Sequence, residues 1–130
     1  MTAPNAARFF MVGATPVKFI PLADGGLGVR KLDPESGAFV YGMELYALAL
    51  SSDPNVDEVD EVQFIQIVES KRAALAHDGP LSALYAQIRA IEEAAAAAQR
   101  PLSPAEKAHL EALKRQTYAR FQAMYPDSGP

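Results

Sequence analysis

Two amphipathic segments separated by Pro101 constrain this fold more than any other feature of the sequence. Apolar side chains in the first segment recur at alternating intervals of three and four residues, at Leu81, Leu84, Ile88, Ile91, Ala95 and Ala98. This heptad spacing is typical of a helix that packs along a single seam. After the proline, Ser103-Pro104-Ala105-Glu106 matches a capping box, in which a serine caps a helix and a glutamate follows three residues later. The two segments therefore predict an antiparallel helical hairpin, with helices over residues 80–100 and 103–125.

Side-chain size changes along the two predicted helices in a matched way. Folding back at Pro101 places the alanines of residues 94–98 opposite those of residues 105–112. It also places the large apolar groups of residues 81–88 opposite those of residues 121–125. Helices approach more closely where side chains are small, so we expect a tapered hairpin whose open end packs on the rest of the fold or on a partner. The seam can close within one chain or between two.

The first 42 residues favour short strands joined by turns. We expect strands over residues 8–12, 17–22, 27–32 and 38–41. Asp24-Gly25-Gly26 tolerates the positive φ of a tight hairpin, and residues 33–37 suit a type I turn with a bulge. Because parallel pairing needs long crossovers, these short loops indicate an antiparallel β-meander of about four strands. The predicted fold class is α+β, with this N-terminal meander followed by helices and the terminal hairpin.

The segment between the meander and the hairpin has two interpretations. Residues 43–51 form too short a run for the period to decide between helix and strand. Ser52-Asp53-Pro54 resembles a helix start, with aspartate as cap and proline at the first helical position, which predicts a helix over residues 54–78. The competing interpretation is a strand in its first half, because Val62–Val68 has high strand propensity. Helix is favoured, since acidic residues come early in the segment and basic residues come late, as a helix dipole prefers.

Composition excludes several classes of protein. The chain has 130 residues, 49% of them apolar, which suits a single domain with one core and flexible tails at residues 1–7 and 126–130. It contains no cysteine and only two histidines, His77 and His109, so we expect no disulfide, thiolate catalysis or typical structural zinc site. No run approaches the ~20 apolar residues of a membrane span, and the first apolar run is too short for a signal peptide. We expect a soluble, cytoplasmic protein that needs no cofactor.

Motifs that carry chemistry are incomplete in this sequence. Residues 53–57 match the opening of a calcium-binding EF loop, but Glu58 stands where the loop needs glycine and Phe64 where it needs glutamate. Gly25-Gly26-Leu27-Gly28 joins two predicted strands, so a hairpin turn explains it better than a phosphate-binding loop does. We therefore predict no catalytic, cofactor-binding or metal-binding residues.

These absences, with a first strand that is apolar on both sides, favour a small non-catalytic protein–protein interaction or assembly protein. Regulators, inhibitors or immunity factors, and structural components of phages or mobile elements belong to this class. The partner is either another protein or a second copy of the chain. The candidate partner surface combines the first strand, the acidic segment and the open end of the hairpin: Phe9, Phe10, Met11, Asp53, Asp57, Glu58, Asp60, Glu61, Leu81, Tyr85, Phe121 and Tyr125.

One alternative is a small ligand-binding domain or enzyme with its site between the sheet and the helices. A general acid–base pair would then combine a carboxylate, Glu44, Asp33 or Glu35, with a tyrosine such as Tyr41 or Tyr46. Nothing in the spacing of these residues recommends the pair.

A second alternative is a module that binds single-stranded nucleic acid. Its binding face would be a basic, aromatic side of the sheet made by Lys18, Arg30, Lys31, Phe19 and Tyr41. A net charge of −4 argues against this function.

Overall fold

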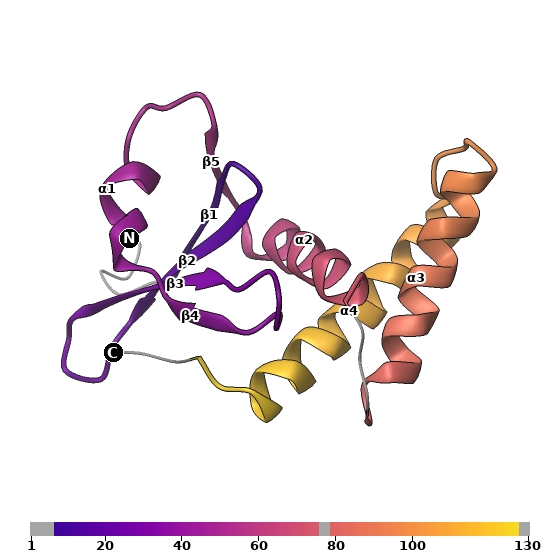
Figure 1. Ribbon diagram of the computed structural model, residues 1–130. Coiled ribbons are helices and arrows are strands. Elements are labelled where there is room, and N and C mark those ends of the chain that lie inside the picture. Colours follow the sequence, from indigo (N-terminus) through magenta and orange to yellow (C-terminus); the bar gives the residue numbers. More distant parts are fainter. Residues whose placement is uncertain (1–6, 76–78, 128–130) are drawn as a thin grey trace. The chain divides into compact units, whose positions relative to one another are not determined.

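The computed structural model describes residues 7–75 and 79–127, and Figure 1 shows the path of the chain. The described residues divide into two compact units. Those up to Phe64, together with Pro126 and Asp127, form the sheet unit, and Ile65–Tyr125 form the helical unit. The boundary falls inside one continuous helix. The expectation that the whole chain makes a single domain stays a prediction.

The order of elements along the described chain is strands first and helices later. The strands are β1 (Arg8–Val12), β2 (Thr15–Pro21), β3 (Leu27–Leu32), β4 (Phe39–Tyr41) and β5 (Val56–Val59). The helices are the short 3₁₀ helix η1 (Met43–Leu45), α1 (Tyr46–Ala49), α2 (Glu61–Ala73), α3 (Ser82–Ala97) and α4 (Pro104–Met124). This order confirms the predicted α+β class. None of the described helices is both long and apolar enough to cross a membrane.

The strands form one antiparallel sheet in the order β4-β3-β2-β1-β5. The first four strands pair in chain order, as predicted for a meander. Gly13, with a φ of 60°, occupies the tight turn between β1 and β2, and Gly25, with a φ of 86°, the turn between β2 and β3. In the second turn the Gly26 amide donates to the Asp24 carboxylate at 2.8 Å. The left-handed backbone at these two positions is the reason that glycine is needed there.

The fifth strand shows that the predicted helix over residues 54–78 begins too early. Residues 56–59 pair with β1 instead. Asp53 stabilises a turn rather than a helix, because its carboxylate accepts the Asn55 amide at 2.8 Å and its carbonyl accepts the Val56 amide at 3.0 Å. The cause is tertiary. Without β5, the apolar strand β1 would lie at the edge of the sheet, so pairing with a short valine-containing segment overrides the local helix signal.

Helix α2 begins at Glu61, and its N-cap is Asp60 rather than Asp53. The Asp60 carboxylate accepts the Gln63 amide at 2.7 Å. Val62–Val68 is helical, as the favoured interpretation predicted. Beyond the end of α2 at Ala73, residues 76–78 of the predicted helix, including His77, lie outside the described part of the chain.

Each face of the sheet carries its own apolar cluster. One cluster consists of Phe10, Val17, Phe19, Val29 and, from α1, Ala49. On the other face, Phe64 at the start of α2 packs between two strands, with its ring centre 4.8 Å from that of Phe9 and 5.8 Å from that of Phe39. Phe9 and Phe10 point to opposite faces of the sheet, so one of them enters each cluster. This explains why β1 is apolar on both sides.

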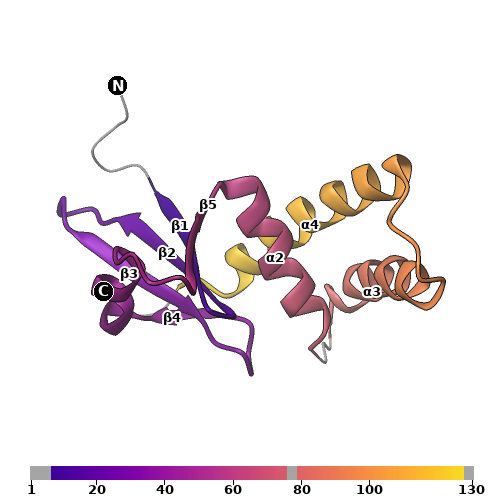
Figure 2. The same cartoon turned by 90° about the horizontal axis from the view of Figure 1, so that it is seen from above.

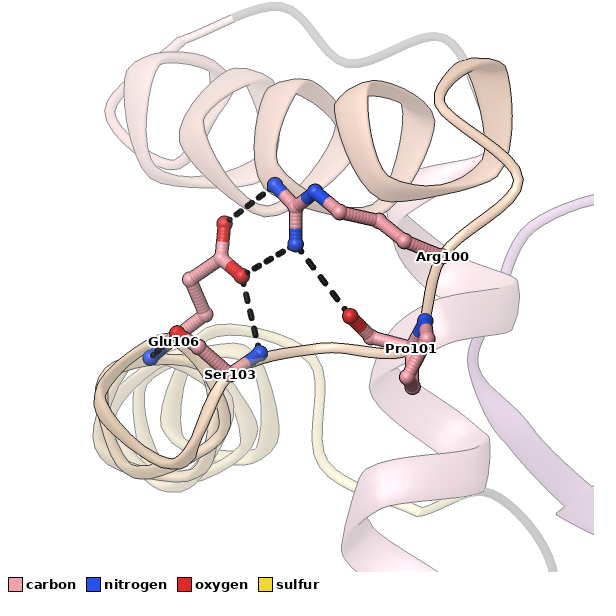
Figure 3. Close-up of polar contacts among 4 residues, drawn as sticks. All are labelled: Arg100, Pro101, Ser103 and Glu106. Carbon is pink, nitrogen blue, oxygen red and sulfur yellow. Dashed lines mark hydrogen bonds and ion pairs between the residues drawn. The ribbon is translucent and has the colours of Figure 1, made fainter.

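Helices α3 and α4 form the predicted hairpin within the helical unit (Figure 2). Its turn contains both bonds of the capping box: the Ser103 hydroxyl accepts the Glu106 amide at 3.2 Å, and Glu106 accepts the Ser103 amide at 2.9 Å. Arg100 adds a clamp that the sequence did not predict. Its guanidinium donates to both Glu106 oxygens, at 2.6 and 2.9 Å, and to the Pro101 carbonyl at 3.2 Å (Figure 3).

The open end of the hairpin is occupied by α2 of the same chain. Tyr85, near the start of α3, donates to Glu69 on α2 at 2.8 Å, and Arg72 on α2 donates to Gln122, near the end of α4, at 2.8 Å. Ile88 is completely buried, as the seam predicts, whereas Met124 is 43% exposed although it was placed on the apolar face of its helix. Within the helical unit, the seam therefore closes inside one chain.

Candidate functional site

Much of the predicted partner surface is buried in the described fold. Phe9 and Phe10 belong to the two clusters of the sheet, and Met11 is half-buried. The buried members in the helical unit are Leu81, Tyr85 and Phe121. Packing within the chain accounts for the apolar character of these residues. The candidate surface narrows to the acidic residues and to Tyr125, which is 49% exposed.

The acidic residues differ in what they contact. Asp53 and Asp60 accept backbone amides in the turn before β5 and at the start of α2. Glu58 receives two hydrogen bonds from Arg8, at 3.0 and 2.8 Å, which lower the pKa of Glu58 and raise the pKa of Arg8. Asp57 and Glu61 are exposed and make no side-chain hydrogen bond or ion pair in the described part of the chain. These two carboxylates contribute charge without a structural role.

The side chains of β5 are divided between the two faces of the sheet. Glu58 lies opposite Phe10, and Asp57 lies opposite Met11. Since successive side chains of a strand point to opposite faces, Glu58 shares the face of the Phe10 cluster and Asp57 the other face. The acidic segment therefore surrounds the edge of the sheet instead of forming one flat patch.

The backbone of β5 has an open edge, because β5 is the last strand in the sheet order. In an antiparallel ladder, hydrogen-bonded residue pairs alternate with pairs that are not hydrogen-bonded. The Gly13 amide donates to the Asn55 carbonyl at 2.7 Å, and this bond shows which pairs of the β1–β5 ladder are hydrogen-bonded. By that alternation, the amide and carbonyl of Glu58 and the carbonyl of Val56 point away from β1. The Val56 amide is already bonded to Asp53. Within β5, the edge thus offers one amide and two carbonyls for pairing with another chain.

Helix α1 adds exposed apolar side chains beside this edge. Tyr46, Leu48 and Leu50 are 40%, 39% and 44% exposed. The helix contacts both β1 and β5, and the Tyr46 ring stacks on Phe19 with 5.4 Å between ring centres. We call these three side chains, together with the open edge of β5 around Glu58, the α1–β5 surface.

The sequence contained a signal for α1 that the prediction did not use. Apolar residues occupy nearly every position from Met43 to Leu50, whereas a half-buried helix needs only one apolar face. The excess must be exposed or must meet a partner. A short helix with Leu45 half-buried and Ala49 buried leaves the larger neighbours on the outside.

The residues proposed for a nucleic-acid-binding face do not share one face. Lys18 and Arg30 lie opposite each other in β2 and β3 and are only 5% and 3% exposed. The Lys18 ammonium lies 2.9 Å from the Asp127 carboxylate and 4.2 Å from the centre of the Phe39 ring. Phe19 points to the opposite face. A buried, ion-paired lysine does not offer its charge to a phosphate backbone.

The residues proposed for an acid–base pair lack an enclosed site. Glu44 forms an ion pair with Lys31 at 3.0 Å, and the side chains of Glu44 and Lys31 are 50% and 38% exposed. Tyr41 and Tyr46 are 47% and 40% exposed. An exposed tyrosine and a solvated carboxylate have no desolvated environment that would tune them for proton transfer.

The helical unit contains a buried polar cluster that the sequence did not predict. Glu69 accepts from the Tyr85 hydroxyl at 2.8 Å and from Arg72 at 2.8 Å, and Arg72 also donates to Gln122 at 2.8 Å. Glu69, Arg72 and Tyr85 are completely buried. Burial raises the pKa of the Tyr85 hydroxyl. A cluster without solvent access cannot meet a substrate, so we assign it to packing of α2 on the hairpin.

Histidines and acidic residues do not assemble a metal site in the described regions. No group of three such side chains there could hold a metal ion. His109 is exposed on α4, as expected for a surface histidine. The beginning of the EF-loop motif forms the turn before β5 and the strand itself, which separates Asp53 from Asp57.

No protein-family model, no curated protein and no solved structure matches this chain.

Proposed function

We propose that this protein is a small non-catalytic interaction protein that binds an extended, basic segment of a partner protein along the α1–β5 surface. The observation that carries the proposal is the open edge of β5, flanked by exposed Tyr46, Leu48 and Leu50. Strand addition to a sheet edge takes its affinity from main-chain hydrogen bonds and its specificity from neighbouring side chains. The class is that of regulators, inhibitors or immunity factors, and assembly components.

Charge supports a basic partner. Residues 53–61 contain five acidic residues and no lysine or arginine. Asp57 and Glu61 are exposed and have no ion-pair partner among residues 7–75 and 79–127, so their charge is available to a cationic segment. Electrostatic complementarity of this kind steers association and rejects partners of the wrong charge.

Charge also opposes pairing of β5 with a second copy of itself. An antiparallel pair centred on Asp57 would place this exposed carboxylate directly opposite its counterpart. Like charges directly opposite each other destabilise a strand pair, and charged side chains are a common protection of edge strands. The edge is therefore closed to self-association and open to a partner that carries lysine or arginine.

Panning a library of displayed random peptides against the full-length protein tests this function. We expect enriched peptides to be extended, to carry lysine or arginine, and to include an aliphatic or aromatic residue for the α1 side chains. Binding of the enriched peptides should fall about three- to tenfold in Asp57→Lys, because Asp57 is exposed on β5 and the change replaces an attraction by a repulsion. Leu50→Ser should weaken the same peptides without changing their preference for basic residues.

Glu35→Lys is the matched control, because Glu35 is an exposed acidic residue of the same unit, in the turn before β4. It makes the same change in net charge and should leave peptide binding unchanged. Enrichment of neutral or acidic peptides, or equal losses in Glu35→Lys and Asp57→Lys, would contradict the proposal.

A further inference from the structure

A groove in the helical unit, away from β5 and α1 in the sequence, has the chemistry of a small-molecule site. It has a volume of about 360 Å³ and is lined by Gln66, Ile67, Ser70, Lys71 and Lys114. The first four residues come from α2 and the last from α4. This volume lies at the lower end of the range of ligand pockets.

One hydrogen-bond donor of the groove has no acceptor within the described residues. The side-chain amide nitrogen of Gln66 is buried and unbonded. An enclosed amide donor left unsatisfied costs free energy that an incoming acceptor recovers. Gln66 lies one turn of α2 before Ser70 and Lys71, so the groove gathers its polar groups on adjacent turns.

Lys114 is held in position by two neighbours. Its ammonium donates to the Ser70 hydroxyl at 2.7 Å and to Glu92 at 2.9 Å, while Ser70 donates to the same glutamate at 2.8 Å. An ammonium has three protons, so one donor of Lys114 remains after these two bonds. The residue is only 5% exposed, which means that its position is fixed before any ligand arrives.

The charges of the groove select the ligand. Lys71 and Lys114 each contribute one positive charge and Glu92 one negative charge, so the three side chains sum to +1. A carboxylate carries −1 and balances this charge, whereas a phosphate monoester carries about −1.5 to −2 at neutral pH. Ile67 and the aliphatic stems of the two lysines form an apolar lining beside the donors.

We infer that this groove binds a small monocarboxylate with a short apolar tail. The carboxylate accepts hydrogen bonds from Gln66, Lys71 and the remaining donor of Lys114, and the tail lies on Ile67. The groove shares no residue with the α1–β5 surface, and the inference does not rest on the proposed partner binding.

Octanoate is the probe for this site. Titration of the full-length, isotope-labelled protein to millimolar concentration, followed by NMR, should produce saturable shifts of the Gln66 side-chain amide and the backbone amides of residues 66–71. Gln66→Leu should weaken octanoate binding about tenfold or more, because a hydrogen bond to a charged acceptor is lost. Lys71→Gln should weaken it about two- to fivefold, as expected for a partly exposed ion pair.

Lys107→Gln is the control, because Lys107 is an exposed lysine on the same helix as Lys114, away from the groove. It should leave octanoate binding unchanged. Octanol tests the apolar tail without the carboxylate, and inorganic phosphate tests the negative charge without the tail. Neither should bind as tightly as octanoate. The inference is overturned if octanoate shifts no groove residue, if octanol or phosphate binds equally well, or if Lys107→Gln weakens binding as much as Lys71→Gln does.

Discussion

The guanidinium carbon of Arg72 lies 3.8 Å from the centre of the Phe121 ring, while one of its nitrogens donates to Glu69 at 2.8 Å. A cation over an aromatic face and an ion pair thus share one buried arginine. Both charged groups are completely buried, so each depends on the other for compensation.

Arg72→Ala should destabilise the protein by about 3–5 kcal/mol, because it leaves the Glu69 charge buried and unpaired. The double variant Glu69→Leu with Arg72→Met should be more stable than Arg72→Ala, since it removes both charges and fills the space. Urea unfolding followed by circular dichroism measures both. Arg100→Ala removes an exposed ion pair and should destabilise the protein far less, because solvent screens such pairs. A cost for Arg72→Ala as small as that for Arg100→Ala would contradict the role of the buried pair.

Ile88→Asp should destabilise the domain by several kcal/mol, because a carboxylate would replace a completely buried side chain of the α3 seam. Ala90→Asp places the same charge on an exposed position of the same helix and should change stability by less than about 1 kcal/mol. Thermal unfolding compares the two variants. Melting of Ile88→Asp close to that of the unaltered protein would refute the packing of the seam.

The hairpin turn has a defined response to acid. Hydrogen bonds from Arg100, then from the Ser103 backbone, lower the pKa of Glu106 from 4.5 to about 2. A carboxylate with a lowered pKa stabilises the folded state above its ordinary pKa, and this contribution is lost as the pH falls from about 4.5 toward 2. An NMR titration should find the Glu106 pKa near 2, and Arg100→Gln should move it back toward 4.5. Arg115→Gln, on the same helix, should leave it in place, and an ordinary Glu106 pKa in the unaltered protein would disprove the clamp.

Asp60→Ala should destabilise the protein by about 1 kcal/mol, because the N-cap of α2 would be lost. Asp57→Ala removes an exposed carboxylate three residues earlier and should change stability by no more than about 0.5 kcal/mol. Chemical denaturation of the two variants checks where the helix begins. Equal effects of the two substitutions would mean that Asp60 does not cap α2.

The parts of the fold that were predictable are those with local causes. Ser103 and Glu106 are three residues apart, and the turn around Gly25 needs only its own residues, so the hairpin and the meander could be read from short windows. Strand β5 could not, because its partner β1 lies about 50 residues away in the sequence, as the Arg8–Glu58 pair shows. The local signal at Asp53 and Pro54 then favoured the wrong element.

The candidate sites also depend on contacts between residues that are far apart in the sequence, and these contacts could not be predicted. Glu69 and Arg72 are polar, and a helical wheel places polar side chains in solvent. Their burial depends on Tyr85 and Gln122, which come from other helices. The exposure of Leu48 and Leu50 likewise depends on which side of a four-residue helix meets the sheet. Tertiary contacts of this kind leave no periodic mark in the sequence.

The long sequence separation between β1 and β5 has a consequence for the time course of folding. Contacts between residues far apart in the chain form later than local ones, because closing the intervening loop costs entropy. The meander can assemble as soon as its hairpins meet, but the outer side of Phe9–Val12 stays unpaired until Val56–Val59 arrives. During that interval a newly made chain exposes an aggregation-prone strand, and the speed at which β5 docks decides how long the chain remains vulnerable.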